Sequence, residues 1–135
     1  SHPKIILPAD VRVKNGDRAF IKTPDALVAT DNILDVGLLS IERLLPVIAD
    51  ARFILWNGPL GNFEHGFRGS TDAVAKFIAA SEAESIVGGG DTVASFRALN
   101  ILDQFDFVST GGGAMLDFLA TGTLPGIEAL KRSRP

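Results

Sequence analysis

The sequence predicts an α/β fold in which helices flank a parallel sheet. After residue 50 one pattern occurs three times: a short apolar run, a turn that contains glycine, and a stretch with helical periodicity. The apolar runs lie at 52–56, 85–87 and 105–108. The segments between them are too long for tight hairpins, so the runs are expected to pair in parallel. Each glycine turn then lies at the carboxyl end of its strand.

A helical stretch completes each of the three units. The first helix is expected at about 70–80, with Ser70 or Thr71 as its N-cap. The second is expected at about 93–99. The third should cover 114–120 and end at Gly122.

The first fifty residues are less regular. Residues 4–7 have the pattern of a strand, 11–22 that of a polar excursion with a turn at 15–17, and 38–49 that of a helix. Pro46 lies inside this helix, which predicts a kink or an early stop. The chain has no initiator methionine and begins almost directly with an apolar run, which suggests that it was cut from something longer.

Composition narrows the classes of function. With 135 residues, 46% of them hydrophobic, the chain can form one domain with a real core. A net charge of −3 and the absence of a basic face argue against nucleic acid and anionic membranes as partners. No apolar stretch approaches the roughly 20 residues of a membrane span. The absence of cysteine excludes disulfides and thiol chemistry and favours a cytoplasmic location.

The glycine turns carry most of the functional signal. Two triple-glycine turns, 88–90 and 111–113, and the Asn57-Gly58-Pro59 turn follow the three expected strands. A helix start offers unpaired amides and a partial positive charge, and glycine lets an anion approach the backbone. One such turn is more often a tight connection. Three in succession, each at the end of a parallel strand, favour an anion-binding edge.

Two acidic residues near these turns have alternative interpretations. Asp91 could be the N-cap of the second helix, or it could hold the Mg²⁺ that accompanies a nucleotide. Glu64 would ordinarily be a solvated loop residue. The sequence contains neither a P-loop nor a Gly-x-Gly-x-x-Gly fingerprint, and its two histidines are isolated from any metal or nucleophile set.

Four motifs taken together resemble the closing motifs of phosphoglycerate kinases in order and approximate spacing. They are WNGPLGNFE at 56–64, IVGGGDT at 86–92, VSTGGGA at 108–114 and LPGIEAL at 124–130. A weaker resemblance at 6–10 and 34–37 extends the similarity over almost the whole chain. It implies a Rossmann-like parallel sheet with flanking helices. The chain would be a truncated half of the C-terminal domain of such a kinase.

The resemblance also implies roles for individual residues. The family transfers a phosphoryl group between 1,3-bisphosphoglycerate and MgADP, and residues 1–135 would be part of its nucleotide-binding domain. Asp91 would meet Mg²⁺, Thr92 a phosphate, and Glu64 the ribose hydroxyls. The residues implied to line the nucleotide pocket are Leu34, Asn57, Gly58, Gly61 and Phe63. The residues implied to face the transferring phosphoryl group are Gly88, Gly89, Gly90, Gly111, Gly112 and Gly113.

The parts of the family that lack a counterpart shape the functional hypothesis. The N-terminal substrate domain and the phosphate-binding lysines are absent, and no lysine or arginine adjoins the glycine turns. We therefore expect a kinase fragment that binds ATP or ADP with Mg²⁺ but is inactive by itself. The alternative is a noncatalytic nucleotide-binding or interaction module. An NAD-binding domain is disfavoured because its fingerprint is missing.

The expected strand order leaves one edge open. The resemblance implies the strand order 3-2-1-4-5-6, in which the strand at 52–56 would lose its inner neighbour, because the first two strands would lie upstream of residue 1. Either 4–7 moves in beside 52–56, or a second copy of the chain covers the gap. The remaining alternative is that 4–7 stands apart and the edge stays bare.

Overall fold

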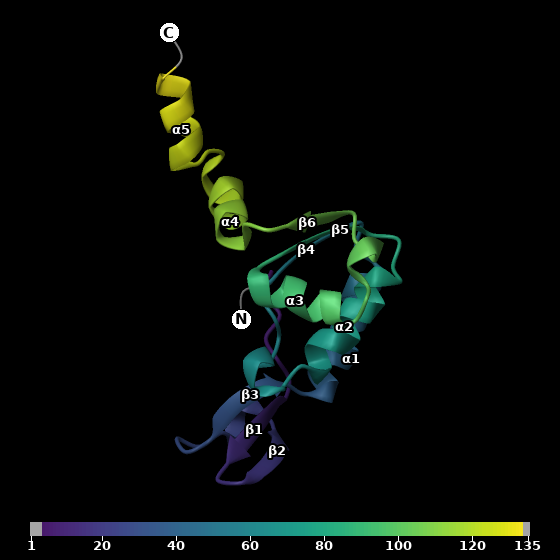
Figure 1. Ribbon diagram of the computed structural model, residues 1–135. Coiled ribbons are helices and arrows are strands. Elements are labelled where there is room, and N and C mark those ends of the chain that lie inside the picture. Colours follow the sequence, from purple (N-terminus) through teal and green to yellow (C-terminus); the bar gives the residue numbers. More distant parts are fainter. Residues whose placement is uncertain (1–3, 134–135) are drawn as a thin grey trace.

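The computed structural model describes residues 4–133 and contains two separate three-stranded sheets (Figure 1). The strands are β1 (Val11–Asn15), β2 (Arg18–Lys22), β3 (Asn32–Val36), β4 (Phe53–Asn57), β5 (Glu84–Gly88) and β6 (Phe107–Ser109). The helices are α1 (Leu38–Ala49), α2 (Gly69–Ala79), α3 (Gly90–Ala98), α4 (Gly112–Thr121) and α5 (Pro125–Arg132). Short 3₁₀ turns are η1 (Pro24–Ala26), η2 (Phe63–His65) and η3 (Leu102–Gln104). Within 4–133, none of the helices combines the length and the apolar character that a membrane span requires.

The predicted parallel sheet is confirmed. Its strands pair in the order β4-β5-β6, and both pairs are parallel. The strands differ by one or two residues from the expected ranges, which is the usual uncertainty at element ends. All three expected helices after residue 50 are also present as α2, α3 and α4.

One face of this sheet packs against α1, α2 and α3 (Figure 1). The core joins apolar side chains of the three helices to Trp56 of β4 and Val87 of β5. Phe96 of α3 is fully buried. Its ring meets that of Trp56 edge-on at 5.1 Å between centroids and stacks on that of Phe105 at 4.9 Å. These rings fix α3, and with it the second glycine turn, against the sheet.

The opposite face of the sheet is largely uncovered. Side chains alternate along a strand, so Phe53 and Leu55 of β4 point away from Trp56 and the helices. Phe53 is 52% exposed, and Phe107 of β6 is 58% exposed. This apolar face reaches the outer edge of β4, which has no strand partner among residues 4–133.

The predicted strand at 4–7 is wrong. Residues 5–8 form no regular element, and the side chains of Ile5, Ile6 and Leu7 are exposed, Leu7 by 68%. An apolar run becomes a strand only when a neighbouring strand accepts its hydrogen bonds. The run neither moves in beside β4 nor joins β5 or β6.

The polar excursion at 11–22 is instead a β-hairpin. β1 and β2 pair antiparallel from Val11 and Lys22 to Asn15 and Arg18, and β3 pairs on the other side of β1. Val13 is fully buried, whereas most other side chains of the hairpin are exposed or half-buried. Only Val11 and Val13 of the hairpin are buried, and each is followed by a charged residue, which explains why the sequence resembles a loop.

A carboxylate from outside α1 caps this helix. Asp10 accepts hydrogen bonds from the backbone amides of Leu39 (3.2 Å) and Ser40 (2.7 Å) and from the Ser40 hydroxyl (2.7 Å). These bonds satisfy amides of the first turn that have no partner within the helix. The helix continues past Pro46 to Ala49, so the early stop does not occur. Proline sits here close to the carboxyl end, where little of the helix remains to be disrupted.

The predicted N-cap of α2 is also wrong. Arg68 occupies the cap position, and both Ser70 and Thr71 lie within the first turn. Their hydroxyls bond to other elements: that of Ser70 donates to the Val36 carbonyl at 2.9 Å, and that of Thr71 accepts from the Leu60 amide at 3.0 Å. The hydroxyls thus tie α2 to its neighbours.

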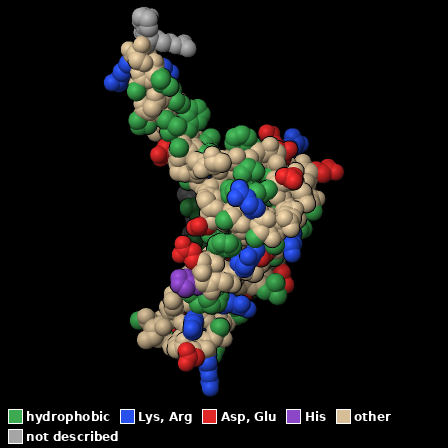
Figure 2. Space-filling view, in the orientation of Figure 1, with side chains coloured by type: hydrophobic (Ala, Val, Ile, Leu, Met, Phe, Trp, Pro, Cys, Tyr) green, Lys and Arg blue, Asp and Glu red, His purple; other side chains and the backbone are tan. Residues whose placement is uncertain are grey.

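The α4–α5 arm, residues 112–132, projects from the body (Figure 1). Gly112 is the single buried residue of α4, and none of the α5 residues is buried. Hydrophobic side chains gather on the part of the arm nearest the body in Figure 2. Leu130 of α5 is 71% exposed. The arm is therefore attached to the body mainly at its first turn.

Replacing Asp10 with alanine should lower the free energy of unfolding by about 1–2 kcal/mol at neutral pH, because the cap of α1 is lost. Burial raises the pKa of Asp10, but the hydrogen bonds from Ser40 and Leu39 outweigh burial and leave the pKa below 3.8. The folded chain therefore binds this proton more weakly than the unfolded chain does. The stabilisation is complete above the unfolded pKa and is lost as the pH falls through the folded value.

Urea unfolding of the wild-type and Asp10→Ala proteins between about pH 7 and pH 2 measures this effect. The stability difference should shrink as the pH falls. Asp17→Ala, at the exposed hairpin turn, is the control and should show a smaller difference at neutral pH and little change with pH. A difference for Asp10→Ala that does not depend on pH would contradict the assignment.

Candidate functional site

The ends of the three parallel strands lie side by side. The register pairs Asn57 of β4 with Gly88 of β5, and Gly88 with Ser109 of β6. Each of these residues is the last of its strand. The turns that follow are therefore gathered at one edge, as the sequence predicts.

The starts of α3 and α4 touch each other at this edge. Gly89 is the N-cap of α3 and has a backbone φ of 92°, which residues other than glycine rarely adopt. A Cβ at Gly112 would lie 2.5 Å from the amide nitrogen and 2.7 Å from the Cα of Gly89. Only glycine at both positions allows this approach. The first-turn amides of two helices are thereby brought together.

Two hydrogen bonds connect these helix starts to the turn after β4. The Asn57 side-chain amide donates to the Gly112 carbonyl at 3.2 Å. The Gly58 backbone amide donates to the Thr92 hydroxyl at 3.0 Å. Asn57 is half-buried, and Thr92 is fully buried in the first turn of α3. The three glycine turns are thus one connected unit.

Asp91 lies beside this unit with an exposed side chain. It is the second residue of α3 and not its N-cap, because Gly89 holds that position without a side-chain capping bond. No group of three or more His, Cys, Asp or Glu that could hold a metal occurs in residues 4–133. Asp91 can thus offer a single carboxylate. Mg²⁺ accepts such a ligand when phosphate and water complete its shell.

The turn after β4 continues as a loop to residue 68, which contains Gly58, Gly61 and Phe63 of the expected nucleotide-lining residues, whereas Leu34 lies in β3 and Asn57 ends β4. Glu64 is exposed and Phe63 half-buried in η2, whereas the side chain of Leu34 is buried. The Asn62 amide donates to the Leu34 carbonyl at 2.7 Å, which brings β3 to this loop. The expected residues therefore do not all line one surface, because Glu64 faces solvent and the Leu34 side chain is buried.

Arg68 is a residue that the sequence analysis missed. Its guanidinium carbon lies 5.3 Å from the centroid of the Phe63 ring, and its Nε donates to the Asp72 carboxylate at 2.8 Å. Phe63 and Arg68 are five residues apart, and residues 66–68 belong to no helix or strand, so no periodic pattern pairs their side chains. It brings a cation to the loop that contains Glu64.

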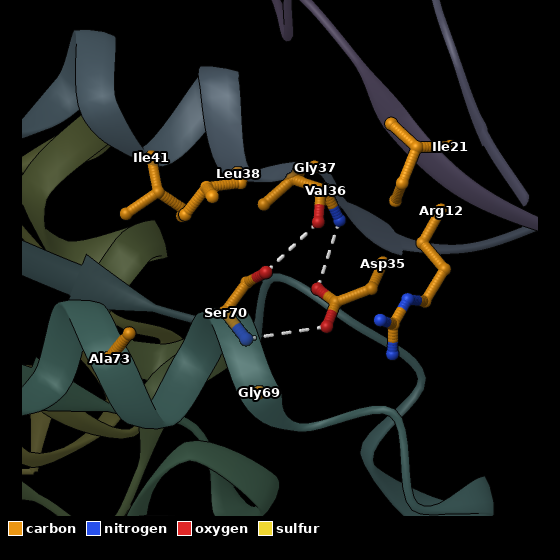
Figure 3. Close-up of a pocket in the computed structure, with 10 residues that line it drawn as sticks. All are labelled: Arg12, Ile21, Asp35, Val36, Gly37, Leu38, Ile41, Gly69, Ser70 and Ala73. Atoms are coloured by element: carbon orange, nitrogen blue, oxygen red, sulfur yellow. Dashed lines mark hydrogen bonds between the residues drawn. The ribbon is translucent and has the colours of Figure 1, made fainter.

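Asp35 contacts the same loop, and the sequence analysis did not single it out either. Its carboxylate accepts from the Val36 amide at 2.9 Å and from the Ser70 amide at 3.3 Å (Figure 3). A Cβ at Gly61 would lie 2.6 Å from the Asp35 Cγ. Asp35 borders a cavity of about 390 Å³ into which the Arg12 side chain also points (Figure 3). Asp35 therefore fixes where the loop passes over the start of α2.

The chemistry available at the strand edge is anion binding. Helix-start amides, a partial positive charge and one exposed carboxylate are suited to a phosphate group that carries a divalent cation. The fold and this edge define a class of α/β proteins that bind ligands at the carboxyl ends of a parallel sheet.

Comparisons narrow this class to one family. A family model described as phosphoglycerate kinase matches residues 1–122. Phosphoglycerate kinase from Buchnera aphidicola subsp. Acyrthosiphon pisum (strain Tuc7) is 42% identical over 134 residues, which cover 96% of this chain and 34% of that protein. The chain belongs to the phosphoglycerate kinase family.

Solved structures agree with this result. Phosphoglycerate kinase from Coxiella burnetii matches with a TM-score of 0.81 and 42% identity, covering 94% of this chain and 34% of that one. The enzyme from Pyrococcus horikoshii OT3 matches with a TM-score of 0.82 and 35% identity, covering 96% and 33%. The chain thus spans about a third of the length of these relatives.

Replacing Gly112 with alanine should destabilise the protein by about 1–3 kcal/mol, because the added methyl group would meet the backbone of Gly89. Gly113→Ala is the matched control. A Cβ at Gly113 has no neighbour within 4 Å, and alanine favours a helix by up to about 1 kcal/mol. Urea unfolding followed by circular dichroism measures both. Equal stabilities of the two variants would contradict the tight contact.

Proposed function

We propose that this chain is the nucleotide-binding part of a phosphoglycerate kinase and binds ADP or ATP with Mg²⁺ at the edge formed by the three glycine turns. The observation that supports this most directly is the contact between the starts of α3 and α4, which brings two sets of unpaired amides together. The family membership of the chain supports the choice of nucleotide.

Individual roles follow from position. Asp91 would hold Mg²⁺ through its exposed carboxylate, and the cation would offset phosphate charge during transfer. The amides of Gly90, Gly111, Gly112 and Gly113 would face the transferring phosphoryl group, and Gly88 and Gly89 would border the phosphates. Glu64 would accept hydrogen bonds from the ribose hydroxyls. Leu34, Asn57, Gly58, Gly61 and Phe63 would surround the nucleotide, with Thr92 beside a phosphate.

The reaction proposed for the whole protein is phosphoryl transfer between ATP and 3-phosphoglycerate in glycolysis, in the cytoplasm. Among residues 4–133, no lysine or arginine lies within the three glycine turns. Phosphoryl transfer depends on cations that neutralise developing charge, so the 135 residues alone should lack activity. The N-terminal domain of the kinase is the proposed partner that completes the site.

Calorimetry with MgADP should show weak, Mg²⁺-dependent binding, in the micromolar range or weaker. A coupled assay with ATP and 3-phosphoglycerate should show no turnover. The amides that bind phosphate are present, but the cations that would strengthen binding and catalysis are not. Nanomolar affinity, or measurable turnover, would refute this division of roles.

Asp91→Ala should weaken binding of MgADP while changing binding of metal-free ADP much less, because only the metal complex loses a ligand. Asp103→Ala is the control: it removes an exposed carboxylate in η3, which precedes β6 and so lies away from the glycine edge. If Asp91→Ala changes both forms of ADP binding equally, the carboxylate does not serve the metal.

The bare edge of β4 supports a further proposal, association with a second copy of the chain. β4 has five residues without a charge or proline, whereas the other edge strand, β6, has only three residues. Long apolar edges without such protection favour strand pairing between molecules. A symmetric antiparallel pairing of two β4 strands would join two sheets and extend their exposed apolar faces.

Sedimentation velocity should detect concentration-dependent dimers of the wild-type chain. Leu55→Lys should abolish them, since a lysine on an edge strand opposes pairing. Phe107→Lys places the same charge on the same face but on β6, and its dimers should persist. A wild-type chain that stays monomeric at every concentration would contradict the proposal, as would equal loss in both variants.

A further inference from the structure

The residue at the end of β4 contacts the starts of both helices at the glycine edge. The Asn57 Nδ2 donates to the Gly112 carbonyl of α4 at 3.2 Å. A Cβ built at Gly89, the N-cap of α3, would lie only 2.6 Å from the Asn57 Oδ1. The same oxygen would lie 2.9 Å from a Cβ at Gly112. The carboxamide therefore occupies the space that these two glycines leave open.

The strand register explains why asparagine suits this position. Asn57 ends β4 level with Gly88, and Gly88 lies level with Ser109 at the end of β6. A side chain from β4 must therefore cross the end of β5 to reach α4. Alanine would be too short to do so, and aspartate would lack the donor that Gly112 accepts from.

The next residue holds the turn in place. The Gly58 amide donates to the Thr92 hydroxyl at 3.0 Å, and the Thr92 side chain is fully buried. α3 is itself fixed by the buried ring of Phe96. The turn after β4 is thus hydrogen-bonded to a helix that is packed into the core, and this bond holds the backbone next to Asn57.

α4 has no comparable support. Gly112 is its single buried residue, and the helix start is held by β6, by the packing of Gly112 and Met115 against Gly89 and Gly88, and by the bond from Asn57. The Asn57 bond joins residues 55 positions apart and connects the first strand of this sheet to the start of α4. Its loss would free the α4 start to move relative to α3.

We infer that Asn57 is a positioning residue that holds the start of α4 against that of α3, so that the amides of both helices converge on the same phosphate. The inference rests on the proposed nucleotide-binding function. It adds a role that lining the nucleotide pocket does not require, since the bond exists within the protein itself. Thr92 supports Asn57 from inside the fold.

The test compares Asn57→Ala with Thr71→Val. Thr71 is also fully buried, and its hydroxyl accepts from the Leu60 amide of the same loop at 3.0 Å, but it lies on α2. Thr71→Val thus removes a similar bond away from the two helix starts. Calorimetry measures the affinities of MgADP and adenosine for each variant. Hydrogen exchange of the α4 amides, measured by NMR without ligand, reports on the helix start.

Asn57→Ala should weaken MgADP binding about tenfold, the effect of one lost hydrogen bond, and change adenosine binding less than twofold. Exchange of the Met115 amide, which donates to the Gly111 carbonyl at 2.8 Å, and of the α4 amides that follow it should accelerate about tenfold in the free protein. Thr71→Val should alter neither the ratio of the two affinities nor α4 exchange. Thr92→Val should change MgADP affinity and α4 exchange in the same direction as Asn57→Ala but by less. Thr92→Ser, which keeps the hydroxyl, should leave both close to their wild-type values.

Two results would overturn the inference. One is unchanged α4 exchange in free Asn57→Ala, which would mean that any effect on MgADP comes from direct contact with the nucleotide. The other is equal acceleration of α4 exchange in Thr71→Val, which would mean general destabilisation. A wild-type chain that binds no nucleotide would refute the proposed function, whereas the exchange measurement would still decide whether Asn57 positions α4.

Discussion

Parallel pairing of β4, β5 and β6 is the constraint on which the rest of the structure depends. Parallel strands all run the same way, so Asn57, Gly88 and Ser109 end in one row and every following turn is delivered to the same edge. The buried ring of Phe96 then holds α3 to the sheet. Without this pairing the glycine turns would be three separate connections.

The elements that are defined by a local sequence pattern could be predicted from the sequence. The run at 85–87 and the glycines after it form one local pattern of strand, turn and helix, and that pattern predicted parallel strands and the location of the edge. The hairpin at 11–22 escaped detection because only Val11 and Val13 face the core among charged neighbours. The prediction of a strand at 4–7 failed for the opposite reason, because this apolar run has no strand to pair with.

In the candidate site, too, local patterns were predictable from the sequence and long-range contacts were not. The sequence predicted the glycines and Asp91 as candidates because they adjoin their strands in sequence. The bonds from Asn57 to Gly112 and from Asp35 to Ser70 join residues 55 and 35 positions apart, and no local pattern announces them. Asp10, which caps α1 from 29 and 30 residues away, was missed for the same reason. Long-range polar contacts are set by the packed fold and become visible only with it.

The attachment of the α4–α5 arm has a mechanical consequence. A segment that is attached at one end can turn about its attachment, which is here the backbone around Gly111 and Gly112. A rotation of a few degrees at this attachment sweeps Leu130, near the far end, through a much larger arc. The attachment also contains amides of the glycine edge. A turn of α4 about this attachment would therefore also displace the groups that are proposed to hold phosphate.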